Sequence, residues 1–369
     1  MKVAIFNWRD IKNPAAGGAE IATHQIAKRL VKAGNEVIQF SARFKNSKKT
    51  EVVGGVKIFR AGNPFSVHFL AFFFYQKNLA GKVDVVVDQI HGLPFFTPIY
   101  VKVPKIAYIH EVAGPIWFWE WPFPVNILGF IAEKLYFFLY KKILFITVSQ
   151  SSKKDLINYG ISQKLITVIQ NGLNPPSLSK NFRKEKFPVI IYLGRIYRAK
   201  RIEEIIIAFK IVQQKYPNSR LWIVGTGKIY YRNYLKNLAR KLNLAKKISF
   251  YEFVNENKKY QLLKKSWIIC GTSVKEGWGL TITEAASVGT PAVVYNVGGL
   301  KDVVISAKTG IICQKNTPEI LAQNLIKLIS DNNLRMKFGR NAQNFVKSLN
   351  WEKTTKEFLK VVNQVIKAS

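Results

Sequence analysis

The chain is poor in cysteine, histidine and acidic residues, and these shortages disfavour several classes of protein. Cys270 and Cys313 are the only cysteines among 369 residues, so neither a disulfide framework nor a Cys-based metal site is available. A reducing cytoplasm is the expected compartment. No Asp-x-Asp pattern occurs and only four histidines are present, which disfavours metal-assisted catalysis. No apolar run approaches the roughly 20 residues needed to span a bilayer.

Basic residues outnumber acidic ones by 57 to 22, giving a formal net charge of +35 at pH 7. The excess is uneven, because residues 1–178 carry 22 basic and 10 acidic residues and the remainder carry 35 and 12. Such a charge suits nucleic acid, an anionic membrane surface or a polyanionic substrate, and a solvated lysine-rich surface would also produce it. Nucleic acid is the weaker alternative, because no helix-turn-helix, zinc-finger or RNP-type motif accompanies the charge.

Length and hydrophobic content indicate a folded protein with two α/β domains. A chain of 369 residues with 48% hydrophobic residues can form two cores. Short apolar segments alternate with helical segments, which predicts doubly wound domains with parallel sheets. The N-terminal apolar segment is too short for a signal peptide and is predicted to be a first strand. Residues 174–188, rich in proline, serine and lysine, are predicted to link the domains. Expected strands lie at 3–6, 36–41, 56–60, 84–87, 106–109, 143–148, 168–172, 189–193, 248–254, 267–271, 291–295 and 310–313. A further strand followed by a glycine turn is expected over 221–227.

Two carboxylates, Glu276 and Glu284, flank a Gly-x-Gly turn in the second half of the chain. Gly277 and Gly279 lack a Cβ, so the backbone there can take positive φ and lie close to a ligand. A helix is predicted over 280–288, and its first N–H groups suit a phosphate. Glu284 lies one turn into this helix and can accept two hydrogen bonds from neighbouring hydroxyls. These features indicate a ligand with phosphates in the middle and hydroxylated rings at both ends.

A cationic loop follows the expected strand at 189–193. Arg195 offers a fork of N–H donors to phosphate oxygens, and Lys200 offers a mobile point charge. These two cations could neutralise a leaving diphosphate, a role that a metal ion would otherwise fill. The later glycine turn at Gly225 and Gly227 lacks the third glycine of a dinucleotide-binding fingerprint.

The first half of the chain has two weaker signals of a site. Gly17 and Gly18 lie between the first expected strand and the first expected helix, an arrangement that lets backbone N–H groups approach a phosphate or a sugar. His110 directly follows the strand expected at 106–109. Because ligands gather at the carboxyl ends of parallel strands, this position favours a functional role for the imidazole.

Aromatic residues are concentrated between His110 and Ser149, with lysines among them. They either fill the core and line an acceptor groove, or form a segment that lies at the headgroup level of a membrane. The apolar stretch at 69–75 could share either role, and the two interpretations have equal weight. The residues concerned are Trp117, Trp119, Trp121, Phe130, Tyr136, Phe137, Phe138 and Tyr140, with Lys134, Lys141 and Lys142.

The acid-and-glycine stretch resembles the donor site of the retaining family 4 glycosyltransferases, the glycosyl transferases group 1. The matching residues are Glu-x7-Glu enclosing Gly-x-Gly-Leu, then Ala-x-x-x-Gly-x-Pro, and then Asn-Val-Gly-Gly-Leu-x-Asp at 296–302. The resemblance covers essentially the whole chain. It implies the GT-B fold, in which two Rossmann-like domains face each other across a cleft. The implied domains are an acceptor-side domain at 1–178, a nucleotide-sugar domain at 179–350 and a C-terminal helix at 351–369 that crosses back to the first.

The resemblance also implies roles for individual residues. Arg195 and Lys200 would grip the donor diphosphate, with Glu276 holding the sugar and Glu284 the ribose. His110 would lie beside the transferred sugar. Further implied donor-site residues are Gly17, Gly18, Phe253, Val254, Gly277, Trp278, Gly279 and Leu280.

At two positions the chain departs from the family pattern. The backbone of Phe253 and Val254 would read the nucleotide base, but Glu252 precedes them where the family usually has glycine. This leaves the identity of the base open. Arg201 stands where the family often has glycine, and it is expected to be tolerated at a helix start.

The expected activity is retaining transfer of a sugar from a UDP- or GDP-linked donor to a glycan or lipid-linked acceptor. Neither a cofactor nor a metal ion is expected. The protein is expected in the cytoplasm, with an anionic membrane surface as a further candidate partner. The alternatives are a nucleotide-sugar epimerase of GT-B fold and a non-enzymatic protein that binds anions or nucleic acid. The sugar, base, acceptor, linkage and oligomeric state stay open.

Overall fold

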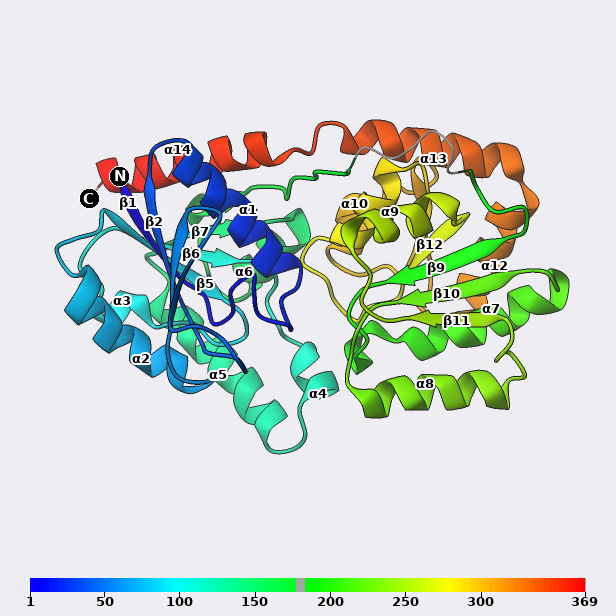
Figure 1. Ribbon diagram of the computed structural model, residues 1–369, viewed down its shortest axis with the longest axis horizontal. Coiled ribbons are helices and arrows are strands. Elements are labelled where there is room, and N and C mark those ends of the chain that lie inside the picture. The colour runs from blue at the N-terminus through cyan, green and yellow to red at the C-terminus, as the bar shows by residue number, and fades with distance from the viewer. Residues whose placement is uncertain (177–182, 369) are drawn as a thin grey trace. The chain divides into compact units, whose positions relative to one another are not determined.

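The computed structural model describes residues 1–176 and 183–368, which form two compact units (Figure 1). The first unit consists of Met1–Trp117, Pro122–Gly172 and Leu349–Ser369, and the second of Phe118–Trp121 and Leu173–Ser348. The boundary expected after residue 178 lies outside the described residues, as does part of the linker expected at 174–188.

The first unit has an eight-stranded sheet in the order β3-β4-β2-β1-β5-β6-β7-β8. Every pair is parallel except β3 and β4, an antiparallel pair at one edge. The strand expected at 168–172 is wrong in its position, because β8 ends at Val168 and pairs with β7 alone. The strands are β1 Lys2–Phe6, β2 Glu36–Ser41, β3 Thr50–Val53, β4 Val56–Arg60, β5 Val85–Ile90, β6 Lys105–Ile109, β7 Leu144–Thr147 and β8 Ile166–Val168.

Helices cover both faces of this sheet, with α1 and α14 on one face and α2, α3 and α5 on the other (Figure 1). The last helix of the chain, α14, packs on α1 and buries Trp351, Phe358 and Val362 at helical spacing. The Thr354 hydroxyl of α14 also donates a hydrogen bond to the carbonyl of Gln170 at 2.8 Å. The helices are α1 Gly18–Lys32, α2 Ser66–Phe74, α3 Thr97–Tyr100, α5 Val125–Leu139, α6 Gln150–Asn158 and α14 Trp351–Lys367. Helix α4, Ile116–Glu120, is divided between the two units after Trp117.

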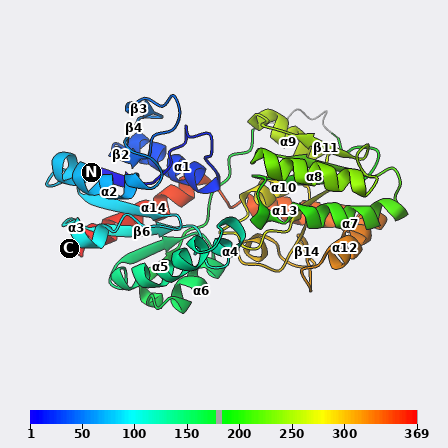
Figure 2. The same ribbon diagram turned by 90° about the horizontal axis from the view of Figure 1, so that it is seen from below.

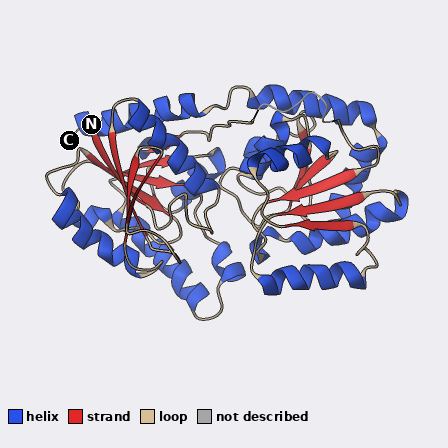
Figure 3. Cartoon of the chain, viewed as in Figure 1, coloured by secondary structure: helices blue, strands red, loops and turns tan. Residues whose placement is uncertain are grey.

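The second unit has a six-stranded, fully parallel sheet in the order β11-β10-β9-β12-β13-β14 (Figure 3). The strand expected at 248–254 ends at Tyr251, so Phe253 and Val254 lie in the following loop. The strands are β9 Val189–Leu193, β10 Arg220–Val224, β11 Ile248–Tyr251, β12 Ile268–Gly271, β13 Ala292–Val294 and β14 Gly310–Ile312. The helices are α7 Ile202–Lys215, α8 Ile229–Lys241, α9 Glu256–Lys265, α10 Leu280–Ser287, α11 Leu300–Val303, α12 Pro318–Ser330 and α13 Asn332–Val346.

Both sheets contain a point at which the order of strands reverses. In the first unit the chain adds β2 and β4 on one side of β1 and then returns to place β5 on the other side. In the second unit it adds β10 and β11 beside β9 and returns to place β12 on the opposite side. Ligands of doubly wound sheets bind at such reversals, outside the carboxyl ends of the strands. The prediction of two doubly wound α/β units is confirmed.

A buried ion pair fixes the loop that leads from β1 to α1. Arg60, at the end of β4, donates hydrogen bonds to both carboxylate oxygens of Asp10, at 2.6 and 2.9 Å. Both side chains are 0% exposed. Glu51 of β3 also accepts from this guanidinium, at 2.9 Å. Since each of these desolvated side chains is the main counter-charge of the other, removal of one leaves an uncompensated charge in the interior.

We expect Arg60→Met to lower the free energy of unfolding by about 3 to 5 kcal/mol, because Asp10 loses its partner while still buried. The matched control is Lys57→Met on the same strand. The Lys57 side chain is 53% exposed and pairs with Glu36 at 3.0 Å, so its loss should cost less than about 1 kcal/mol. Urea denaturation followed by far-UV circular dichroism measures both. Equal shifts in the two variants would contradict the importance assigned to the buried pair.

Candidate functional site

Lys200 and Glu276 come from the two loops at the reversal point of the second unit, and their side chains are in contact. Lys200 ends the short turn Arg198–Lys200 after β9, and Glu276 follows β12. The Lys200 ammonium donates a hydrogen bond to Oε1 of Glu276, and the Ser273 hydroxyl donates to the same oxygen at 2.7 Å. The two charged side chains are only 12% and 22% exposed. The structure therefore brings together two residues that the sequence separates by 76 positions.

Two cations of this loop face a single aromatic ring. The Arg195 guanidinium lies 5.1 Å from the centroid of Tyr197, and the Lys200 ammonium lies 5.2 Å from it. The Tyr192 hydroxyl donates a hydrogen bond to the Arg195 carbonyl at 2.8 Å, which fixes the loop to the end of β9. The electron-rich ring face lets both cations be held near each other despite their like charge.

The helix predicted after the glycine turn is present as α10, beginning at Leu280. Gly279 precedes it with a φ of 65°, the left-handed conformation expected for that turn, whereas Gly277 does not have positive φ. The Trp278 side chain is only 3% exposed. The first N–H groups of α10, those of Leu280 and Thr281, have no acceptor within the helix and carry partial positive charge.

The backbone of Glu276 is supported by a glycine from another loop. Gly299 follows β13 and has a φ of 77°. A Cβ on Gly299 would lie 2.2 Å from the Glu276 carbonyl oxygen, so any larger residue would displace Glu276. This close approach gives a physical reason for one glycine of the Asn-Val-Gly-Gly-Leu motif.

Glu284 forms an ion pair that the sequence did not reveal. Its carboxylate accepts a hydrogen bond from the Lys259 ammonium of α9 at 2.6 Å, and the two side chains are 15% and 12% exposed. Lys259 also bonds Glu256 at 2.7 Å. Burial tends to lower the pKa of Lys259, but the two carboxylates outweigh burial and raise that pKa above its usual value. Lys259 is therefore a charged group that holds Glu284 in place.

Both departures from the family pattern have a structural setting. Arg201 directly precedes α7 with a φ of 50°, which explains why glycine is frequent at this position in the resembled family. The chain nevertheless accommodates arginine, whose guanidinium pairs with Glu204. Glu252 pairs with Arg232 of α8 at 2.7 Å. The neighbouring Phe253 side chain is 84% exposed and is free to turn toward a ligand.

In the first unit, charged side chains gather at the reversal point between β1 and β5. Glu20 of α1 accepts a hydrogen bond from the Gly17 N–H at 2.6 Å and another from Arg9 at 3.1 Å. His91, which follows β5, places its Nδ1 3.7 Å from Glu20. The predicted Gly17 N–H donor is therefore already engaged by Glu20. Sequence reasoning missed Arg9 and His91, although the position of His91 directly after a buried strand was an available signal.

His110 lies at the end of β6, next to His91. Their rings are stacked, with centroids 6.0 Å apart. His110 is 6% exposed, and its Nε2 is buried with no hydrogen-bond partner among residues 1–176 and 183–368. Burial, helped by the nearby His91, lowers the pKa of His110 to about 3. At neutral pH the imidazole is therefore uncharged and retains hydrogen-bonding capacity that these residues do not use.

We expect the buried histidines to make the protein less stable in acid. Burial also lowers the pKa of His68 to about 4. Below the unfolded value of about 6.5, the unfolded chain binds protons that the folded chain does not, so stability falls as the pH is lowered. At about pH 4.5 each of these two histidines should cost about 2 to 3 kcal/mol relative to neutral pH.

This pH dependence can be measured by urea denaturation between pH 7 and 4.5. His110→Gln and His68→Gln should each reduce the acid-induced loss of unfolding free energy by the share of the histidine that is replaced. Carboxylates titrate equally in wild type and variant, so the difference between the two reports the one histidine. If both variants keep the full wild-type pH dependence, the lowered pKa values are wrong.

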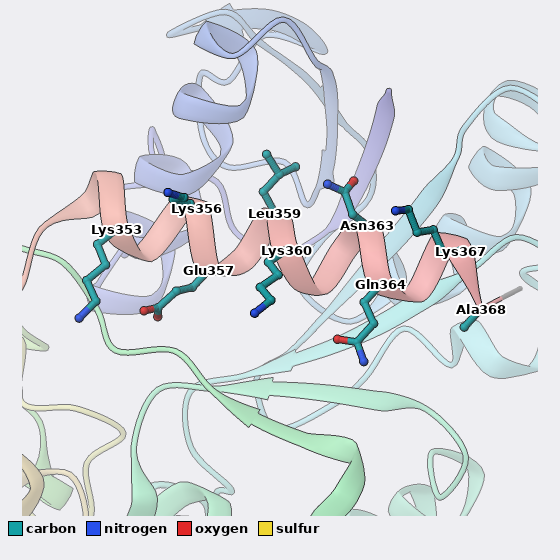
Figure 4. A pocket seen from close by; sticks show the side chains of 9 residues that line it. All are labelled: Lys353, Lys356, Glu357, Leu359, Lys360, Asn363, Gln364, Lys367 and Ala368. Atoms are coloured by element: carbon teal, nitrogen blue, oxygen red, sulfur yellow. The ribbon is translucent and has the colours of Figure 1, made fainter.

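A surface hollow of about 830 Å³ lies along α14 of the first unit (Figure 4). It is lined by residues of that helix and by Ala368 after it, and four of these residues are lysines. Figure 4 shows that Leu359 and Asn363 point to one side of the helix whereas Glu357, Lys360 and Gln364 point to the other. Since these side chains diverge, the hollow is a poor candidate for the functional site.

In the described part of the chain, no group of three His, Cys, Asp or Glu residues is placed to hold a metal ion.

Two family models match adjacent parts of the chain. The model described as Glycosyltransferase Family 4 matches residues 16–176, and the model described as Glycosyl transferases group 1 matches residues 176–345. An uncharacterized glycosyltransferase of Methanocaldococcus jannaschii is 26% identical over 98% of this chain and 97% of its own length. The capsular polysaccharide biosynthesis glycosyltransferase CapM of Staphylococcus aureus is 28% identical over 59% of this chain and 60% of its own length.

Solved structures share the fold along the whole chain. Sucrose-phosphate synthase from Thermosynechococcus elongatus has a TM-score of 0.83 at 19% identity, with all of both chains covered. HepE of Anabaena, in complex with UDP and glucose, has a TM-score of 0.76 at 18% identity and covers 99% of this chain and 100% of its own. At these identities the likeness concerns the fold.

Proposed function

Because the chain belongs to the group 1 glycosyltransferases of family 4 type and has the GT-B fold, we propose that it moves a sugar from a nucleoside diphosphate sugar to an acceptor hydroxyl with retention of configuration. The observation that carries this proposal is the contact between Lys200 and Glu276 at the reversal point of the second sheet. A cation that can bind a phosphate lies there beside a carboxylate that can bind hydroxyl groups. A sugar phosphate carries both kinds of group, so a site that binds it requires both kinds of side chain.

The donor diphosphate binds to positive groups that surround this contact. Arg195 and Lys200 face the Tyr197 ring from the loop after β9. The free N–H groups at the start of α10 follow Glu276 by a few residues and add a fixed partial positive charge. These groups do not have to reorganise when charge develops on the leaving diphosphate, which is the condition for effective electrostatic stabilisation. They take the role that a metal ion has elsewhere, so transfer proceeds without one.

The hydroxylated ends of the donor bind to the carboxylates. Glu276 holds the sugar hydroxyls, with Ser273 and Lys200 fixing its orientation. Glu284 accepts hydrogen bonds from the ribose hydroxyls while Lys259 keeps it in place. UDP is the first nucleotide to test, because the HepE structure of the same fold holds UDP and glucose. In the first unit, the buried Nε2 of His110 has no hydrogen-bond partner among the described residues, and a hydroxyl of a bound sugar would satisfy it.

In the proposed reaction the bond between the anomeric carbon and the phosphate oxygen breaks, and its electron pair leaves with the diphosphate. The acceptor oxygen forms the new bond on the same face of the sugar. The proton of the acceptor hydroxyl passes to the leaving phosphate oxygen, so no protein nucleophile is needed. The acceptor class is a polysaccharide or lipid-linked glycan, which fits the capsular polysaccharide role in the name of CapM.

The first test is thermal stabilisation by UDP or GDP, each with Mg²⁺ and with EDTA. A nucleotide at 100 times its Kd stabilises the folded state by roughly 2.7 kcal/mol. We expect one nucleotide to stabilise the wild type equally in Mg²⁺ and EDTA, because protein cations take the place of the metal. Lys200→Ala and Glu284→Ala should lose most of this effect.

Lys215→Ala is the matched control for Lys200→Ala, since it removes an exposed lysine at the far end of α7. It should keep the full stabilisation. Absence of any shift with either nucleotide, or a shift seen only with Mg²⁺, would contradict the proposed donor site.

The second test measures transfer itself, with the responding nucleotide sugar and a glycan or lipid-linked acceptor. Lys200→Ala should lower kcat/KM by roughly 10²- to 10³-fold, the usual effect of removing one group that stabilises developing negative charge. Lys215→Ala should leave the rate unchanged. Proton NMR of the first product should show the anomeric configuration of the donor. An inverted product would overturn the retaining mechanism.

A further inference from the structure

The first unit exposes a large set of apolar side chains on the helices that cover one face of its sheet. They come from α2 and the residue before it, from α3 and from α5, and many are more than half exposed, which is unusual for phenylalanine and leucine. We call this set the apolar face. Its members are Phe65, Phe69, Phe72, Phe73, Ile99, Val125, Ile127, Leu128, Ile131, Leu135, Phe138 and Leu139.

Helix α5 has two apolar sides, and the unit covers only one of them. Its inner side buries Tyr136 and Phe137 in the core. Its outer side carries Leu128, Ile131, Leu135 and Phe138, which are 61%, 48%, 67% and 68% exposed. The spacing of three, four and three residues aligns these four side chains in one stripe. Because these outer side chains are apolar and exposed to water, a second apolar environment that covers them would stabilise the helix.

Contacts with shared partners link the three helices. Phe72 of α2 packs edge-on against Tyr100 of α3, with ring centroids 5.4 Å apart. Thr97 of α3 and Tyr140 at the end of α5 both donate hydrogen bonds to the buried carboxylate of Asp88. Figure 1 shows the helices together below the sheet, and Figure 2 views the unit from that side.

The charges around the apolar face are positive. Lys134 and Lys141 lie over the rings of Phe130 and Phe138, at 4.6 and 4.5 Å from the centroids, and Lys142 follows them. The sequence places one acidic residue in these three helices, Glu133, and it is 1% exposed.

The Glu133 carboxylate points inward, where it accepts hydrogen bonds from the N–H groups of Ala113 and Gly114, both at 2.7 Å. The lysines therefore extend along aromatic rings beside exposed leucines, and the one carboxylate of these helices is turned away. An anionic lipid surface offers the matching environment, with negative phosphates for the lysines and an apolar layer beneath them for the leucines and rings.

We propose that the apolar face docks on an anionic bilayer, with α5 lying in the headgroup region and its lysines at the phosphates. The helix has 15 residues, too few to cross a membrane. Across the described residues, no helix is both long and apolar enough for a span. The docking proposal depends only on the exposed residues of the apolar face. That the membrane also carries the acceptor rests in addition on the proposed function.

Vesicle co-sedimentation at low salt tests the docking. The wild-type protein should bind vesicles of equimolar phosphatidylcholine and phosphatidylglycerol, bind phosphatidylcholine vesicles far less, and dissociate at high salt. Leu135→Ser with Phe138→Ser should lower the partition coefficient by at least ~10-fold through lost apolar burial. Lys134→Glu with Lys141→Glu should lower it by at least ~25-fold, at roughly 5-fold for each lysine charge removed.

Each double variant has a matched control. Val52→Ser with Ile229→Ser removes side chains that are 63% and 75% exposed but lie outside the apolar face. Lys241→Glu with Lys246→Glu makes the same charge change on exposed residues of the second unit. Both controls should bind vesicles as the wild type does. Far-UV circular dichroism and urea denaturation of each variant verify that it is folded.

Three results would overturn the proposal. One is failure of the wild type to bind the anionic vesicles at low salt. The second is equal loss of binding in the test and control charge variants, which would mean that net charge alone drives adsorption. The third is concentration-dependent dimerisation that the serine pair abolishes, without vesicle binding, which would assign the apolar face to a second copy of the chain. None depends on nucleotide binding, so failure of docking and failure of the transferase proposal are separable.

Discussion

A parallel sheet whose strand order reverses leaves an opening at its carboxyl edge, since the two loops at the reversal run to opposite sides. Both units of this protein use that opening in the same way. In the second unit it holds Lys200 and Glu276, and in the first it holds Glu20 and His91. These polar groups meet because of topology, since each pair is distant in sequence. The chemistry of the protein thus depends on the order in which its strands are added.

A second constraint is the scarcity of carboxylates. With 22 acidic residues against 57 basic ones, most basic residues cannot have a carboxylate of their own, which favours keeping their charge in water. Several carboxylates of the first unit are buried and serve as acceptors for particular donors. Asp10 binds Arg60, Asp88 binds Thr97 and Tyr140, and Glu133 holds the loop after His110. These buried carboxylates fix the conformation of loops inside the first unit, and they leave the excess of basic residues on the surface.

The sequence predicted the fold class, most strands and the helix that begins at Leu280, because these depend on local periodicity and on glycine chemistry. It could not predict that Lys259 holds Glu284 or that Ser273 supports Glu276, since those contacts follow from tertiary packing. The edge strand β3 was also missed, because it has only four residues, Thr-Glu-Val-Val, and none of them is buried. The aromatic segment stayed ambiguous for a similar reason. Helical spacing places apolar residues on both sides of α5, and only the structure tells which side the core covers.

The C-terminal helix has a consequence for the order of folding. Helix α14 packs on α1 within the first unit, although the whole second unit separates it from the rest of that unit in the sequence. At a synthesis rate of 5–20 residues per second, roughly 10 to 40 s elapse between translation of Gly172 and of the last residue. During this interval the first unit lacks a helix, and the apolar side of α1 that α14 later covers is accessible to chaperones. The second unit is contiguous apart from a short segment made earlier, so it can complete its core first.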